Sequence, residues 1–276
     1  MISFCLRAGI THAAIADHNS VKGIAEALSA AEGKNLELIP AIEMDCVITE
    51  MNLHLLGYGI DITNPVFDAV EAGMRKQEQQ TSALLMRLIR NLGIDFDDDV
   101  IASLSIDGVV TGEMIAEAAL LHDHTGKNAL LDPYRKQGAR SDNPYVNFYW
   151  DFCSQGKPAY IPMTFISLTE AIRIINSNGG VSVLAHHPGV NIRENPALLK
   201  EVIATGVQGI EVFSSYHSTE QFQFYQQIAQ SHGLIMTCGS DFHGKTKKNI
   251  KIGKTECEGL EDQIIHALKQ AISSTY

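Results

Sequence analysis

Short runs of apolar and β-branched residues alternate along the chain with stretches in which apolar residues recur every three or four positions. This alternation predicts a parallel sheet covered by helices. The predicted strands are Ile10–Ala16, Leu36–Ile42, Asn52–Tyr58, Gly180–Ala185, Gln208–Phe213 and Leu234–Gly239. The predicted helices around them are Met1–Gly9, Ser20–Gly33, Leu168–Asn178, Pro196–Thr205, Thr219–Ser231 and Leu260–Ile272. The strands are one or two fewer than a closed α/β barrel needs.

The strand rhythm stops between residues 63 and 167, where the pattern becomes helical. This stretch contains helix-like runs and a polar segment rich in Gly and Arg, namely Pro65–Leu92, Gly112–Leu121, Pro144–Gln155 and the polar segment Asp123–Asn143. A stretch of about 100 residues is too long for a loop inside a barrel, so we expect an inserted, mostly helical domain with a mobile loop. The predicted organisation is a barrel in two parts, 1–62 and 168–276, interrupted by a domain at 63–167.

The composition is that of an ordinary globular protein with an acidic surface. Of the 276 residues, 45% are apolar, and the balance of 21 Lys and Arg against 32 Asp and Glu gives a formal net charge of −11. Such a chain lacks the general basic surface that binds duplex nucleic acid. We therefore expect a phosphorylated small-molecule partner, held by local cations or metal ions. The pattern leaves the oligomeric state open.

The cysteines and the N-terminus bear on the cellular compartment. The five cysteines are scattered and contain no CxxC pair, which indicates a reducing environment. The sequence has no signal-peptide pattern, and no apolar stretch approaches the roughly 18 residues of a membrane span. We expect a soluble, cytoplasmic protein with no membrane partner.

Histidines and carboxylates gather in or directly after the predicted strands. In chain order they are Asp17, His18, Glu43, His54, His186, His187, Asp241 and His243. The carboxyl ends of parallel strands meet on one face of an α/β barrel, so these side chains are expected to converge there. Any one of them has a plainer explanation, as a helix cap or a hydrogen-bonded core residue. The joint pattern favours a metal site, and imidazole with carboxylate suits Zn, Mn or Fe.

Six short motifs carry these residues, and together they resemble a known family. They are Ala-Asp-His-Asn-Ser at 16–20, Ile-Pro-Ala-Ile-Glu at 39–43, Leu-His-Leu-Leu-Gly-Tyr at 53–58, Val-Leu-Ala-His at 183–186, Gly-Ile-Glu-Val-Phe at 209–213 and Ser-Asp-Phe-His at 240–243. In this order they resemble the polymerase and histidinol phosphatase (PHP) superfamily of metal-dependent phosphoesterases. The resemblance implies a distorted seven-stranded (β/α) barrel that holds two or three divalent metal ions.

One subgroup of that superfamily has a helical insertion between the second histidine motif and the Leu-Ala-His motif, and the chain resembles it most. The likeness includes Gly-Lys-Pro-Ala-Tyr-Ile-Pro at 156–162. Members of the subgroup remove phosphate from nucleotides or short oligonucleotides. Carried over by position, the implied metal ligands are His18, Glu43, His54, His186, Asp241 and His243.

Two further residues are implied to assist catalysis. Asp17 is expected to orient a neighbouring group, and His217, in Ser-Tyr-His-Ser, is a candidate contact for the phosphate or the leaving group. The choice between His186 and His187 as ligand stays open. Strand alternation from Leu184 favours His186, whereas alignment on the following proline favours His187.

The chain departs from the family pattern at its start. The family begins with a strand bearing His-x-His and a following Asp, whereas Met1–Gly9 is predicted to be helical and His12 stands alone. We expect a barrel that lacks its first strand and a natural protein that begins upstream. Reduced metal loading and weak phosphatase activity are expected in the chain as given, with restoration when an upstream His-x-His segment is added.

The inserted domain departs as well. The subgroup's Arg-Pro-His is replaced here by Thr111-Gly112-Glu113. Cations of the polar segment can substitute, and Arg135 and Arg140 are the candidates for binding the substrate phosphate, because a guanidinium is a planar fork that matches phosphate oxygens. A solvated charged loop is the alternative.

These patterns predict a phosphomonoesterase that acts on a nucleotide or a short oligonucleotide through metal-activated hydroxide. The ions are expected to be Mn, Zn or Fe. The alternative is a catalytically impaired binding or regulatory module, which the missing first strand favours. Hydrolysis of a C–N bond by an amidohydrolase-like barrel also fits histidines at strand ends, but it does not fit the spacing of Glu43 and His54.

Overall fold

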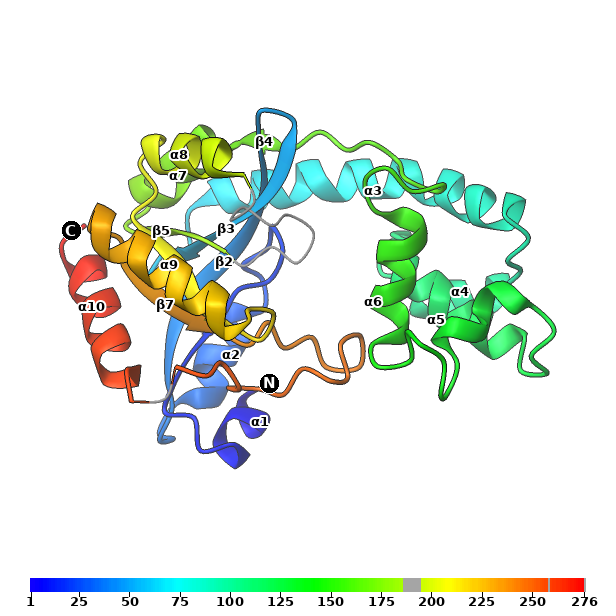
Figure 1. The fold of residues 1–276 in the computed structure, drawn as a ribbon, viewed down its shortest axis with the longest axis horizontal. Helices are drawn as coiled ribbons and strands as arrows, with labels where there is room; N and C mark the ends of the chain where they lie inside the picture. The colour runs from blue at the N-terminus through cyan, green and yellow to red at the C-terminus, as the bar shows by residue number, and fades with distance from the viewer. Residues whose placement is uncertain (186–194, 258, 276) are drawn as a thin grey trace. The chain divides into compact units, whose positions relative to one another are not determined.

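The computed structural model describes residues 1–185, 195–257 and 259–275. The chain divides into two compact units. The first comprises Met1–Glu71, Phe165–Asp241 and Ile252–Tyr276, and the second comprises Ala72–Thr164 and Phe242–Lys251. The first unit contains the sheet and the second is built from helices (Figure 1).

Among the described residues, seven strands form one sheet in the first unit. They are β1 (His12–Ile15), β2 (Glu37–Ile48), β3 (Met51–Tyr58), β4 (Ile166–Ser167), β5 (Val181–Leu184), β6 (Gly209–Ser214) and β7 (Ile235–Gly239). The order of hydrogen-bonded neighbours is β1-β2-β3-β5-β6-β7, and β4 pairs with the end of β2. The sheet curls and carries helices outside it, which confirms the predicted barrel-type α/β fold (Figure 1).

Strand β3 runs antiparallel to both of its neighbours, so the prediction of a wholly parallel sheet is wrong. Ile48 of β2 pairs with Met51 of β3, which leaves Thr49 and Glu50 as the whole turn. Their φ angles are 45° and 66°, and positive φ at both central residues is the mark of a type I′ turn. A two-residue link can only reverse the chain, whereas a parallel pair needs a crossover of about a dozen residues.

The helices of the first unit confirm the predicted pattern, with ends that shift by a few residues. They are α1 (Ile2–Arg7), α2 (Ile24–Ala31), α7 (Leu168–Ser177), α8 (Pro196–Ala204), α9 (Thr219–His232) and α10 (Glu261–Ser273). Local signals fix their ends. Ser218 and Gln221 form a capping box at the start of α9, and Gly233, with φ of 65°, ends it in the left-handed conformation.

The two faces of the sheet pack into different cores. Ile42, Met44 and Leu55 belong to the cluster that packs against the surrounding helices. Ala41 and Leu56 face the other way and pack with Leu268 of α10. Because side chains alternate along a strand, the face that holds Ala41 continues along β2 to residues 43 and 45. This face is apolar near the start of β2 and polar further along.

The second unit is built from helices, most of them within the stretch where a helical insertion is expected. Its elements are most of α3 (Pro65–Asn91), then α4 (Asp98–Leu104), α5 (Gly112–His122), the 3₁₀ helix η1 (Ala129–Tyr134), α6 (Pro144–Phe148) and the π-helical turn η2 (Tyr149–Cys153). Ile89, Ile115, Leu131 and Phe148 are fully buried in its core. Helix α4 is not among the predicted elements. Within the described ranges, no helix combines the length and apolarity needed to cross a bilayer.

The turn between β2 and β3 gives a test of the hairpin. Replacing Thr49→Asn and Glu50→Gly together should stabilise the protein, because Asn-Gly accepts positive φ at lower cost than Thr-Glu. We expect a gain of about 1 kcal/mol, which raises the thermal midpoint by roughly 2–4 °C for a protein of this size. The substitution removes a hydrogen bond from Thr49 to Glu201, which is exposed and long at 3.3 Å, so little is lost.

The matched control is Thr49→Ala with Glu50→Ala, which shortens both side chains without easing positive φ. Its thermal midpoint should equal or fall below that of the wild type. A lower midpoint for the Asn-Gly variant than for the Ala-Ala variant would contradict the turn geometry.

Candidate metal centre

Backbone pairing beyond the end of β1 places His18 beside Glu43. These two residues form an isolated parallel bridge. The amide of Glu43 donates to the carbonyl of Asp17 at 3.1 Å, and the amide of Asn19 donates to the carbonyl of Glu43 at 2.7 Å. The sheet therefore extends into the loop after β1, and the loop holds the His18 ring next to the Glu43 carboxylate.

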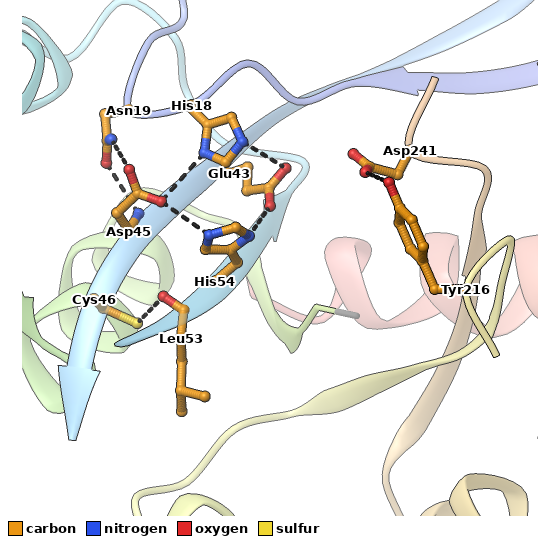
Figure 2. Close-up of polar contacts among 9 residues, drawn as sticks. All are labelled: His18, Asn19, Glu43, Asp45, Cys46, Leu53, His54, Tyr216 and Asp241. Carbon is orange, nitrogen blue, oxygen red and sulfur yellow. Dashed lines mark hydrogen bonds and ion pairs between the residues drawn. The ribbon is translucent and has the colours of Figure 1, made fainter. Parts of the chain in front are cut away.

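His54 reaches the same place through the register of the β2–β3 hairpin. It pairs with Asp45, and Glu43 lies two residues before Asp45 on the same face of β2. His54 Nδ1 lies 2.6 Å from Glu43 Oε1, and His18 Nε2 lies 3.9 Å from Glu43 Oε2. One ligand atom each from His18, Glu43 and His54 can be chosen so that all three lie within 4.8 Å of one another (Figure 2).

Asp45 lies against the other edges of both histidine rings. Its Oδ1 is 3.2 Å from His18 Nδ1 and 3.3 Å from His54 Nε2. The two rings stand edge to face, with centroids 4.9 Å apart and an angle of 81° between their planes. Asp45 is not among the predicted site residues. Its signal in the sequence is its i+2 spacing from Glu43, which puts both carboxylates on one face of a strand.

Asn19 fixes the Asp45 carboxylate. Its side-chain amide donates to Asp45 Oδ2 at 2.6 Å, and its Oδ1 accepts from the backbone N–H of Asp45 at 3.0 Å. Asn19 is buried and has a φ of 54°, a left-handed conformation that Asn tolerates better than most residues. It too is not among the predicted site residues, although it is part of the Asp-His-Asn motif.

The charges of this group act strongly on each other. Burial alone would lower the pKa of the His18 imidazole, but the carboxylates of Glu43 and Asp45 outweigh it and raise this pKa to about 10. Burial alone would raise the pKa of Asp45, but the charge of His18 and the hydrogen bond from its ring hold this pKa below its usual range. Asp241 also contributes to the field on His18, so the end of β7 faces the same group.

Asp241 is held by a tyrosine from the loop after β6. Tyr216 Oη donates to Asp241 Oδ2 at 2.6 Å (Figure 2). Burial, followed by the charge of Asp241, raises the pKa of Tyr216, so its hydroxyl stays a donor. Asp241 has a φ of 51°, which is uncommon for a residue other than glycine. Nearby, Glu211 is buried, and Gly239 leaves the room its carboxylate occupies, since a Cβ there would collide with Oε1.

The remaining predicted site residues lie in varied surroundings. Asp17 is exposed, and its backbone carbonyl accepts a hydrogen bond from the backbone N–H of Glu43. His217 lies with Nδ1 2.8 Å from the carbonyl of Val212 and its ring against Tyr225. His243 lies in the segment that belongs to the second unit. His186 and His187 lie outside the described residues, and the roles given to all of these side chains stay predictions.

The two predicted phosphate-binding arginines pair with carboxylates of the second unit. Arg135 Nη2 donates to Asp123 Oδ2 at 2.7 Å. Arg140 donates through Nε and Nη2 to the two oxygens of Asp151, both at 3.0 Å. These contacts favour a structural role, but they leave a second role on a substrate untested.

The donor set fits a divalent metal ion. Glu43, with its side chain 4% exposed, lies between two imidazoles that are 41% and 25% exposed, so the group is buried on one side and open on the other. Burying a carboxylate is costly unless a cation or hydrogen-bond donors compensate it. Nitrogen and oxygen donors at this spacing suit Zn, Mn or Fe.

Comparison with known proteins yields related enzymes over most of the chain. The chain is 28% identical over 249 residues to a 3′,5′-nucleoside bisphosphate phosphatase from Chromobacterium violaceum, covering 88% of this chain and 80% of that protein. It is 27% identical over 237 residues to the 5′-3′ exoribonuclease Rnm of Escherichia coli, covering 83% of this chain and 74% of that protein. No family model matches the chain.

A solved structure shares the fold. It is that of a candidate metal-dependent phosphoesterase from Bifidobacterium adolescentis, with a TM-score of 0.72 and 27% identity, covering 98% of this chain and 89% of that chain. The shared fold, the similarity over most of each sequence and the His-Glu-His group agree with the resemblance carried by the six motifs. The chain is therefore similar, in sequence and in fold, to metal-dependent phosphoesterases of the polymerase and histidinol phosphatase superfamily.

Proposed function

We propose that this protein hydrolyses a phosphomonoester of a nucleotide or a short oligonucleotide with the help of divalent metal ions. The observation that carries the proposal is the group formed by His18, Glu43 and His54, with ligand atoms within 4.8 Å of one another. The names of the relatives support the substrate class, since one is a nucleoside bisphosphate phosphatase and another an exoribonuclease.

In this proposal the chain's own residues bind and orient. His18, Glu43 and His54 hold the metal, and Asp241 joins them with its carboxylate oriented by the hydroxyl of Tyr216. His243 and one of His186 and His187 complete the ligands. Divalent ions bound there supply positive charge that stabilises phosphate oxygens and lowers the pKa of water. That charge also allows a protein with a net charge of −11 to bind an anionic substrate.

Other residues are proposed to act on the substrate. Arg135 and Arg140 contact its phosphate, and His217 contacts the phosphate or the leaving group. Asp17 orients a neighbouring group, because its backbone already bonds that of Glu43.

A phosphatase screen with added Mn²⁺ tests the function. The panel comprises a nucleoside 3′,5′-bisphosphate, a mononucleotide, a short 5′-phosphorylated RNA, p-nitrophenyl phosphate and an amide. We expect release of phosphate or nucleotide that disappears with chelator, and no cleavage of the amide. Faster cleavage of the amide would overturn the proposal. A chain that binds Mn²⁺ but cleaves no ester would be the catalytically impaired binding module.

Substituting a ligand should reduce bound metal without unfolding the protein. For Glu43→Gln and His54→Ala we expect Mn²⁺ affinity and any phosphatase rate to fall by at least the roughly 10–100-fold known for residues that merely support ligands. Metal content per chain and circular dichroism are the measurements. His12→Ala is the matched control, because His12 lies on β1, next to β2, but contacts Glu37 at 3.5 Å and not the His-Glu-His group. Unchanged metal content in both ligand variants would refute the assignment.

The arginine hypothesis needs variants that separate binding from stability. If Arg140 contacts the phosphate, Arg140→Ala should raise KM by roughly 10–100-fold, the effect of losing a charge-assisted hydrogen bond of about 1.5–3 kcal/mol. Asp151→Asn is the control, since it breaks the same ion pair but keeps the guanidinium. Equal kinetics in the two variants would assign Arg140 a structural role only, and Arg135→Ala with Asp123→Asn repeats the test for the other pair.

A further inference from the structure

We propose that Asp45 is a positioning residue that orients both histidines of the metal centre at once. The inference rests on the proposed function, because it assigns to one carboxylate the task of presenting His18 and His54 to the metal. Asp45 would not itself be a ligand.

The two rings lie between two carboxylates. His18 turns Nε2 toward Glu43 at 3.9 Å and Nδ1 toward Asp45 at 3.2 Å. His54 turns Nδ1 toward Glu43 at 2.6 Å and Nε2 toward Asp45 at 3.3 Å. The nitrogen that faces Glu43 is therefore a different one in each ring, and the opposite nitrogen of each ring faces the same oxygen, Asp45 Oδ1.

This arrangement assigns the protons. A neutral imidazole has one N–H and one acceptor nitrogen, and the partner of the N–H fixes which is which. Asp45 Oδ1 makes a hydrogen bond with Nδ1 of His18, and Nε2 of His54 lies 3.3 Å from the same oxygen, so we assign the proton of each ring to the nitrogen that faces Asp45. With a metal ion bound, each ring would be neutral, and its acceptor nitrogen would be Nε2 in His18 and Nδ1 in His54, both on the Glu43 side and able to bind the ion. A carboxylate behind a ligating histidine is the usual device for fixing its orientation in metal sites.

Asp45 is itself held rigidly enough for this task. Its other oxygen, Oδ2, accepts from the Asn19 amide at 2.6 Å, and its backbone N–H donates to the same Asn19 side chain at 3.0 Å. Asn19 follows His18 directly, and His54 is the cross-strand partner of Asp45. The carboxylate is thus tied to the loop that carries one histidine and to the strand that carries the other.

The chemistry requires a carboxylate at this position. An ionised carboxylate is an acceptor at both oxygens, so Asp45 can accept from two rings and from Asn19 together. An asparagine in its place would keep the shape but replace one acceptor oxygen by an NH₂ donor. Either the Asn19 amide or the two rings would then meet a donor.

The test uses Asp45→Asn in the full chain, with Mn²⁺ alone as the probe of affinity. We expect the Mn²⁺ affinity to fall by about 10–100-fold while the number of ions bound at saturation is unchanged. Glu37→Gln is the matched control, since Glu37 lies on β2, as Asp45 does, and its carboxylate contacts a histidine outside the metal centre, His12 of β1. It should leave the Mn²⁺ affinity unchanged.

Nitrogen NMR of the Zn²⁺-loaded chain measures which ring nitrogen of each histidine carries the proton. Replacing a residue with a purely structural role would not change this. In the wild type we expect the proton on Nδ1 of His18 and on Nε2 of His54, and in Asp45→Asn we expect these protons to exchange faster or change nitrogen. Asn19→Gly is the second variant in case Asp45→Asn does not fold. Glycine keeps the positive φ of 54° but removes the amide, so affinity should fall in the same direction and by less.

Each failure has a distinct meaning. A wild-type chain that binds neither Mn²⁺ nor Zn²⁺ would overturn the proposed function and this role with it. Wild-type binding with unchanged affinity in Asp45→Asn and Asn19→Gly would overturn the role of Asp45 alone. Loss of a whole ion at saturation in Asp45→Asn would also overturn it, because Asp45 would then be a ligand.

Discussion

The site in the first unit depends on how the cost of burying the charged Glu43 carboxylate is offset. This side chain is 4% exposed and lies on a sheet face that is apolar at Ala41, two residues earlier, and at Leu56, the cross-strand partner of Glu43. A carboxylate in such a position is costly unless positive charge or donors surround it. The loop after β1 supplies His18, and the hairpin supplies His54. The same two imidazoles make the site suited to a metal ion, because their ring nitrogens can act as metal ligands.

Much of the site could be predicted from the sequence, but partly for a reason that the structure corrects. His18 follows the end of β1, as the strand-end argument predicts, whereas Glu43 lies in the middle of β2. His54 does not end a parallel strand. It lies within an antiparallel one and reaches the site through its register with Asp45. Two geometries therefore bring the same residue types together, and the motif alone does not distinguish them.

The residues that were not predicted have a common physical origin. The predicted strand ends at Ile42, whereas β2 continues to Ile48. Glu and Asp have low strand propensity, so Glu43 and Asp45 disfavour continuing the strand beyond Ile42 until its pairing with β3 is known. Asp45 becomes a site residue only through that tertiary pairing. The ion pair of Arg140 could not be predicted either, since its carboxylate lies eleven positions away, a contact that helical or strand periodicity does not reveal.

Two of the seven described non-glycine residues with positive φ lie at the site. Asn19 and Asp241 both have positive φ, at 54° and 51°, and each adjoins or is a proposed ligand. Such conformations cost on the order of 1–3 kcal/mol and persist where the surroundings over-determine them. For Asn19 those surroundings are two hydrogen bonds with Asp45 and the hydrogen bond from its backbone N–H to the carbonyl of Glu43. For Asp241 they are the hydrogen bond from the hydroxyl of Tyr216. These hydrogen bonds therefore hold two polar residues of the site in conformations that most residues avoid.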